Sequence, residues 1–166
     1  MKFPIKSIMG ASALLLLTSA AIADISQAED AAYRKAVQFT PIGFAMSPTN
    51  CNGMGTSGYT MRVRIPVTRG LDYVIIVGTD AAARYTQLYV YDEVGGLIIR
   101  DLRGVQHPTV KFRSSYNGEV ICYMNMARTS GLAAYSVMVG RRGQGNKADT
   151  FNGEIPSIEG AAPAAN

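Results

Sequence analysis

Tryptophan is absent from this 166-residue chain, histidine occurs once and cysteine twice. Two cysteines and one histidine are too few for a structural zinc site, which takes four ligands. The nucleophile motif G-x-S-x-G is also missing, and the glycine-rich segment 51–58 lacks the lysine of a P-loop. The lone histidine, His107, precedes Pro108 and is expected in an exposed loop rather than in a catalytic triad. These absences predict a protein that is not an enzyme and holds no metal.

A long apolar segment is missing as well. The apolar run at residues 8–17 is shorter than the about 20 residues that a helix needs to span a bilayer. It follows two lysines and precedes the sequence AIA at 21–23, which fits a signal-peptidase site. We therefore predict a signal peptide at residues 1–23, cleavage before Asp24, and a periplasmic, secreted or cell-surface protein. An uncleaved N-terminal anchor is the alternative.

Neither sign of charge dominates the chain. The precursor has 16 basic and 12 acidic residues, and loss of the two lysines in the signal peptide leaves 14 against 12, a net charge of about +2. This excess is too small and too evenly spread to indicate nucleic-acid binding. The expected partner is instead a protein or polysaccharide of the envelope or the extracellular space.

The two cysteines, Cys51 and Cys122, are predicted to form a disulfide. Export places them in an oxidising compartment, and an even cysteine count there favours pairing. The bridge would close a loop of about 70 residues and contribute roughly 4 kcal/mol. The alternative is that both thiols stay free, with Cys122 buried in a strand.

Residues 24–58 are predicted to form a short helix and a connecting loop. The sequence SQAE at 26–29 has the capping-box pattern, and alanine-rich sequence continues to about Gln38. Residues 47–58 are rich in glycine, serine and asparagine, which is typical of a loop. At the other end, residues 141–166 have the composition of a flexible tail, or of a segment that becomes ordered on a partner.

Residues 59–140 are predicted to form the core of a β-sandwich. Apolar residues there alternate with polar ones, and turn signals separate short segments. The fold class is therefore all-β, an antiparallel jelly-roll or immunoglobulin-like sandwich of seven to eight strands with one N-terminal helix. The expected strands are 59–65, 72–79, 86–92, 96–100, 109–113, 118–126 and 133–140, with 39–47 as a candidate eighth.

The order of these features resembles the bacterial pre-peptidase C-terminal (PPC) domain. The resemblance is carried by a G-x-x-Y entry at 70–73, a Leu-x-Val-Tyr-Asp-x-x-Gly hairpin at 88–95 and a glycine-to-tyrosine strand at 118–123, and it covers about half of the precursor. It implies a non-catalytic accessory role, such as binding matrix or polysaccharide, aiding secretion, or steadying a neighbouring domain. A surface-fibre subunit with an immunoglobulin-like fold is the other structural relative.

Calcium binding is implied only by that resemblance, since some relatives bind calcium. The acidic residues of this chain are dispersed, and none belongs to a D-x-D-x-D-G loop. A copper site is also a weak candidate, because Met124 and Met126 share one strand face with Cys122, which indicates core positions, and His107 is distant in sequence. The acids considered as calcium ligands are Asp72, Asp80, Asp92, Glu93 and Asp101.

The hairpin TQLYVYDEVGGLIIRD, residues 86–101, is the best candidate for a ligand-binding surface. With Leu88 and Val90 facing the core, Tyr89 and Tyr91 share the opposite face with Gln87. Tyrosine offers a flat apolar face and a polar tip, which suit sugar rings or peptides. The simpler interpretation is a hairpin whose tyrosines only pack over a sheet.

We expect Tyr85 to extend this aromatic platform and three arginines to favour acidic glycans or acidic protein surfaces. These arginines are Arg84, Arg100 and Arg103. A hydrolase that uses Asp92 and Asp101 as paired carboxylates is a third, weaker interpretation. The leading hypothesis is an exported, non-catalytic binding or accessory module of the cell envelope. The alternative is a self-assembling structural subunit of a surface fibre or pilus-like assembly.

Overall fold

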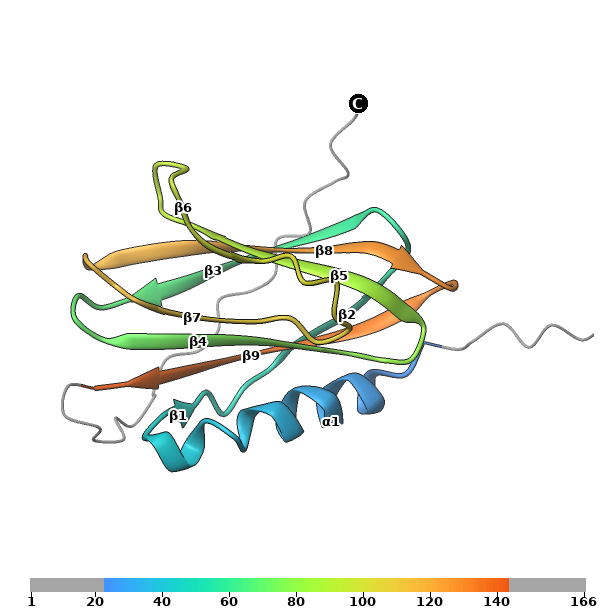
Figure 1. The fold of residues 1–166 in the computed structure, drawn as a ribbon, viewed down its shortest axis with the longest axis horizontal. Helices are drawn as coiled ribbons and strands as arrows, with labels where there is room; N and C mark the ends of the chain where they lie inside the picture. Colours follow the sequence, from blue (N-terminus) through green and yellow to red (C-terminus); the bar gives the residue numbers. More distant parts are fainter. Residues whose placement is uncertain (1–22, 144–166) are drawn as a thin grey trace, which may run out of the picture.

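In the part of the chain that the structure describes, two antiparallel β-sheets pack face to face, and one α-helix lies on the back of one of them (Figure 1). The computed structural model describes residues 23–143, so the predicted signal peptide except its last residue, and most of the predicted tail, lie outside the described residues. Sheet A contains β1 (Ala45–Met46), β2 (Cys51–Gly55), β4 (Asp72–Thr79), β7 (Thr109–Arg113) and β9 (Ala133–Arg142). Sheet B contains β3 (Tyr59–Val67), β5 (Ala83–Tyr91), β6 (Leu97–Asp101) and β8 (Gly118–Thr129).

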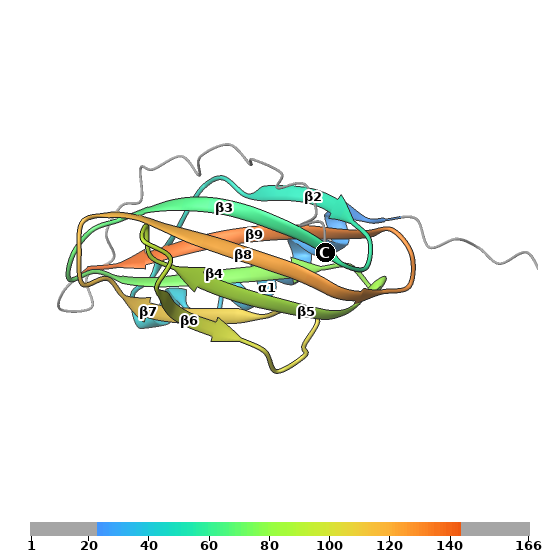
Figure 2. The same ribbon diagram turned by 90° about the horizontal axis from the view of Figure 1, so that it is seen from above.

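The strands of each sheet follow the order of an all-β sandwich, so the predicted fold class is confirmed. Sheet A runs β1-β9-β4-β7, with β2 also paired to β9, and sheet B runs β3-β8-β5-β6 (Figure 2). The described part of the chain contains no helix that is long and apolar enough to cross a membrane.

The segment predicted as a loop at 47–58 contains a strand, β2. Its glycines misled the prediction because they serve close packing rather than a turn. A Cβ atom at Gly53 would lie 2.4 Å from the hydroxyl of Tyr135, and one at Gly55 would lie 2.5 Å from the ring of Tyr59. The candidate strand at 39–47 is mostly a 3-10 turn (Thr40–Ile42) followed by the two residues of β1.

Strand burial reflects two separate cores. In β3, β5 and β8 every second side chain enters the core between the sheets, while the others face outward, as the period of two predicts. Strand β4 is buried on both faces, because Val74 and Ile76 lie under the helix while Ile75 and Val77 face sheet B. A strand covered on both sides loses the alternation of polar and apolar residues.

Helix α1 (Ile25–Ala36) covers the back of sheet A through its alanines. Its N-cap is Asp24, whose side chain accepts a hydrogen bond from the Gln27 amide at 3.1 Å. The predicted capping box at 26–29 is therefore wrong, because those residues already lie within the helix. The helix approaches β4 so closely that a Cβ atom at Gly78 would stand 2.1 Å from the Ala28 carbonyl oxygen.

The predicted disulfide is wrong, since both cysteines are free and buried. Cys51 belongs to sheet A and Cys122 to sheet B, and each fills its own place in the core as a small apolar side chain. The Cys51 thiol lies 3.9 Å from the sulfur of Met61. Burial raises the pKa of Cys51 to about 11 and that of Cys122 to about 12, so both thiols are protonated at neutral pH.

Candidate functional site: a tyrosine face on sheet B

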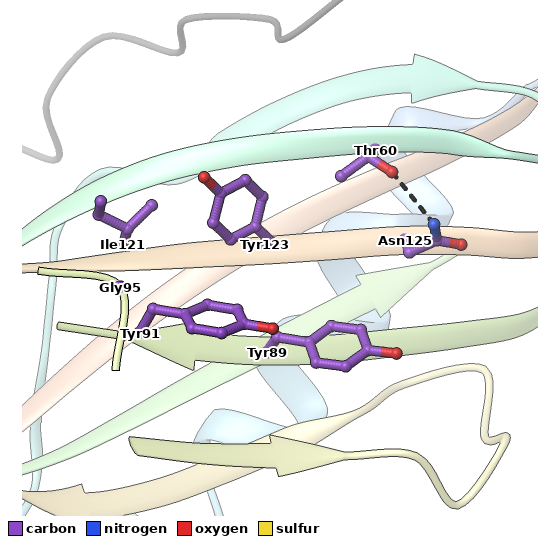
Figure 3. Close-up of a pocket in the computed structure, with 7 residues that line it drawn as sticks. All are labelled: Thr60, Tyr89, Tyr91, Gly95, Ile121, Tyr123 and Asn125. Carbon is purple, nitrogen blue, oxygen red and sulfur yellow. Dashed lines mark hydrogen bonds between the residues drawn. The ribbon is translucent and has the colours of Figure 1, made fainter. Parts of the chain in front are cut away.

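The outer face of sheet B carries a group of half-buried tyrosines over an open hollow of about 460 Å³ (Figure 3). Strands β3, β5 and β8 supply its side chains, and the β5–β6 turn supplies one wall through Gly95. We call this surface the tyrosine face. Its residues are Thr60, Tyr89, Tyr91, Gly95, Ile121, Tyr123 and Asn125.

Strand register brings the three tyrosines together. Tyr89 of β5 pairs directly with Tyr123 of β8, and Tyr91 pairs with Ile121. The rings of Tyr89 and Tyr91 are stacked, with centroids 6.4 Å apart, and Tyr123 meets Tyr91 edge-on at 5.6 Å. Contacts between aromatic rings in these geometries hold the rings in place, so the surface is formed before a ligand arrives.

Some polar groups at the hollow are hydrogen-bonded within the protein, and others can bond a ligand. The Tyr89 hydroxyl donates to the Gln87 side chain at 3.1 Å, and the Asn125 amide donates to the Thr60 hydroxyl at 3.1 Å. Within residues 23–143 the hydroxyls of Tyr91 and Tyr123 make no hydrogen bond. These two hydroxyls are free to bond a ligand that lies across the rings.

Arginines flank the tyrosines along one row of the sheet. Arg62 of β3 pairs with Tyr123, Tyr123 pairs with Tyr89, and Tyr89 pairs with Arg100 of β6. Side chains at paired positions point to the same face, so the row reads Arg-Tyr-Tyr-Arg across four strands. Arg100 is exposed, while the buried Nε of Arg62 has no hydrogen-bond partner among the described residues. A row of this kind favours an anionic partner.

The neighbouring Arg64 is engaged already. Its guanidinium lies 3.2 Å from the carboxylate of Glu119 on β8, and both side chains are well exposed. An exposed pair of this kind contributes little to stability. It neutralises the positive charge beyond the Arg-Tyr-Tyr-Arg row, so Arg62 and Arg100 carry the positive charge beside the tyrosines.

The β5–β6 turn projects outward beside the tyrosines (Figure 1). The Asp92 carboxylate accepts from the backbone amides of Val94 at 3.1 Å and Gly96 at 2.6 Å, and Gly95 has a φ of 89° that favours glycine. The turn is therefore rigidly held while Val94 at its tip is 91% exposed. Leu97 and Ile98 of the same hairpin are exposed as well, and a group of exposed apolar side chains is typical of a contact with another protein.

The residues predicted from the sequence are divided between this site and other places. Tyr89, Tyr91 and Arg100 lie on the tyrosine face or its row. Arg84 falls in the irregular part of β5, where the register with β8 shifts. Tyr85 lies beside Gly104, and its hydroxyl donates to the Leu102 carbonyl at 3.2 Å.

Arg103 also lies away from the tyrosine face, because it is bound to Asp101. Its guanidinium binds both carboxylate oxygens of Asp101, at 3.0 Å and 2.8 Å. These bonds lower the pKa of Asp101 to about 2. Asp101 is buried at the end of β6, whereas Asp92 sits in the turn at the other end of the hairpin. The structure therefore does not bring these two acids together as a catalytic pair.

Sequence reasoning missed the contributions of β3 and β8. Tyr123 and Asn125 alternate with the core residues Cys122, Met124 and Met126, so the period of two already placed them on the outer face. The strand register, which sets Tyr123 beside Tyr89 and Arg62, is a long-range property that the sequence did not reveal. Among residues 23–143, no group of three or more His, Cys, Asp or Glu side chains is placed to hold a metal ion.

No protein-family model and no curated protein matches the chain. Among solved structures, the chain is similar to PliG of Aeromonas hydrophila, a periplasmic lysozyme inhibitor of g-type lysozyme. The sequence identity is 15%, the match covers 60% of this chain and 89% of that chain, and the TM-score is 0.45. A likeness of this degree does not bear on the function of the present chain.

Proposed function

We propose that this chain is an exported, non-catalytic binding module that holds an acidic protein surface against its tyrosine face. The observation that carries the proposal is the row formed by Arg62, Tyr123, Tyr89 and Arg100. Tyrosine and arginine are, with tryptophan, the residue types enriched at the energetic centres of protein interfaces. This accessory role is also what the resemblance to PPC domains implies.

A protein partner fits the surroundings of the hollow better than a sugar. The hollow is open, and the β5–β6 hairpin that supplies Gly95 to its wall carries three exposed apolar side chains. These side chains are Val94, Leu97 and Ile98, which are 91%, 47% and 36% exposed. A sugar ring would use the tyrosines but would leave this apolar edge in water. A protein surface can cover both.

The test is capture of the partner from envelope and culture-medium fractions by crosslinking to the tagged mature protein. Tyr123→Ala and Tyr89→Ala are expected to weaken binding of the captured protein by roughly 30-fold or more each, as interface tyrosines commonly do. The matched control is Tyr33→Ala, since Tyr33 is 63% exposed on α1, on the opposite side of the molecule.

Each outcome of the capture decides between specific possibilities. Retention of a distinct protein that is lost with Tyr123→Ala but not with Tyr33→Ala supports the proposal. Capture of polysaccharide would replace the protein partner with a glycan. Capture chiefly of the chain itself would favour the fibre-subunit alternative. Binding that is unchanged in both tyrosine variants would place the binding surface elsewhere.

A further inference from the structure

Asp80, which follows β4, is a buried carboxylate whose hydrogen-bond donors among residues 23–143 are all backbone nitrogens. It is 3% exposed. Its Oδ1 accepts from the amides of Ala82 at 3.0 Å and Ala83 at 3.3 Å, and its Oδ2 accepts from Ala134 at 3.0 Å. None of the ion pairs among the described residues includes Asp80. A carboxylate buried to this degree is usually paired with a cation.

The fourth donor to Asp80 is the backbone nitrogen of Asp24, 3.0 Å from Oδ2. Asp24 is the N-cap of α1, and the first turn of the helix is tied to the same corner through Gln27, whose side chain accepts from the Ala81 amide at 2.6 Å. The start of the helix and the β4–β5 turn therefore meet at Asp80.

The nitrogen that meets Asp80 belongs to the residue that follows the predicted signal-peptidase site. Cleavage before Asp24 would change this nitrogen from a neutral amide with one N–H into an α-ammonium group with three. It would do so without requiring the nitrogen to move, since the amide is already at hydrogen-bond distance.

We propose that Asp80 is a docking site for the new N-terminus, and that the α-ammonium of Asp24 forms an ion pair with it that completes the packing of α1 on sheet A. Before cleavage the buried carboxylate has no cation among the described residues. After cleavage it has one at the correct position. This inference does not depend on the tyrosine face, but it rests on the export that the proposed function also assumes, through cleavage before Asp24.

The helix itself opposes a positive charge at this end, because the N-terminus of a helix carries a partial positive charge of its own. An isolated ammonium at Asp24 would therefore be unfavourable. Two carboxylates reverse the balance: Asp80 lies at 3.0 Å, and the Asp24 side chain caps the helix amides. The amide hydrogen bond to Asp80 is charged only on the acceptor side, whereas the ammonium would place a charge on both sides and give the buried carboxylate a cation.

A thermodynamic cycle tests the pair on the mature chain. One form begins at Asp24 with a free α-amino group, and a second carries one additional glycine before Asp24, which restores the amide and moves the charge away. The form that begins at Asp24 is expected to have a Tm about 3–8 °C higher. Asp80→Asn in both forms is expected to remove most of this difference. If the form that begins at Asp24 and the glycine-extended form have equal Tm values while both keep Asp80, the proposal is wrong.

Two further measurements keep the test decisive. Asp24→Asn retains the α-ammonium and an N-cap, so the glycine extension should still lower its Tm. Acylation of the α-amino group at neutral pH should be roughly tenfold slower than in an unfolded peptide of the same sequence, because the carboxylate favours the charged, unreactive form. This readout serves even where Asp80→Asn does not fold. Rapid acylation, or N-terminal sequencing of the exported protein that does not begin at Asp24, would contradict the inference.

Discussion

At the scale of single residues, His107 shows how one ring nitrogen fixes the end of a strand. Its Nδ1 accepts a hydrogen bond from the backbone amide of Thr79, the last residue of β4, at 3.1 Å. The ring is half-buried rather than exposed as the sequence predicted, and burial lowers its pKa below the usual 6.5, with smaller effects from Arg34 and Lys35. Only the neutral ring can accept this bond.

The free energy of unfolding should therefore depend on pH through His107. Because its folded pKa is lowered, the unfolded chain binds the proton first as pH falls. Stability should be full above about pH 6.5 and should decrease below it, until the folded-state pKa is passed. His107→Asn, which keeps an acceptor that does not titrate, should flatten the curve between pH 5 and 7 in urea unfolding. An equal slope in both proteins would show that other groups are responsible.

At the scale of secondary-structure elements, the contact between α1 and β4 depends on the glycine at position 78. Gly78 faces the backbone of Ala28 and Ala32 in the helix, and a Cβ atom there would lie 2.1 Å from the carbonyl oxygen and 2.4 Å from the amide nitrogen. Both atoms belong to helix backbone, so they cannot move aside as a flexible side chain can. The helix must shift as a unit if this space is filled.

Gly78→Ala should accordingly lower the free energy of unfolding by about 2–3 kcal/mol, through displacement of α1. Ser136→Ala is the matched control, because Ser136 pairs with Gly78 on β9 and its buried hydroxyl has no partner among the described residues. Removing that hydroxyl should be neutral or mildly stabilising. Both changes are measured by chemical denaturation, and a Gly78→Ala protein as stable as its parent would argue against the tight helix–sheet contact.

The elements also show what could be predicted from the sequence and what could not. The alternation of apolar and polar residues predicted β3, β5 and β8 and their solvent-facing sides, because a period of two is a local property of the sequence. It missed β2, whose glycines make room for Tyr59 at the start of the next strand and for Tyr135 of β9, far along the chain. Long-range packing also decides that Tyr123 pairs with Tyr89 and that the two cysteines stay unbonded. A short stretch of sequence carries no information about such packing.

At the scale of the whole molecule, sheet B, sheet A and α1 form three successive layers (Figure 1). Sheet A is covered by sheet B on one side and by the helix on the other. The outer face of sheet B carries the tyrosines and the arginines of the proposed binding surface. The proposed partner therefore approaches from the side opposite the helix.

Charge at this face should act mainly on the rate of association. Higher salt should slow association of the captured protein by roughly tenfold or more and change dissociation little, because exposed charges steer the encounter. Arg100→Glu should slow association in the same way at low salt. Lys111→Glu, an equal change of charge at an exposed position of β7 in sheet A, should not. Surface plasmon resonance measures the association rates of the three proteins at low and high salt. Rates that do not change with salt would indicate an uncharged partner surface.

The burial of both thiols has a practical consequence for attaching this molecule to surfaces. The chain contains only Cys51 and Cys122, and neither is accessible to a thiol reagent in the folded protein. A Tyr33→Cys variant would therefore carry a single reactive handle on α1, on the side away from sheet B. Maleimide coupling at that position would orient every immobilised copy alike, with its tyrosines presented to the solution, and would make the protein a uniform sensor layer without any change to the surface being studied.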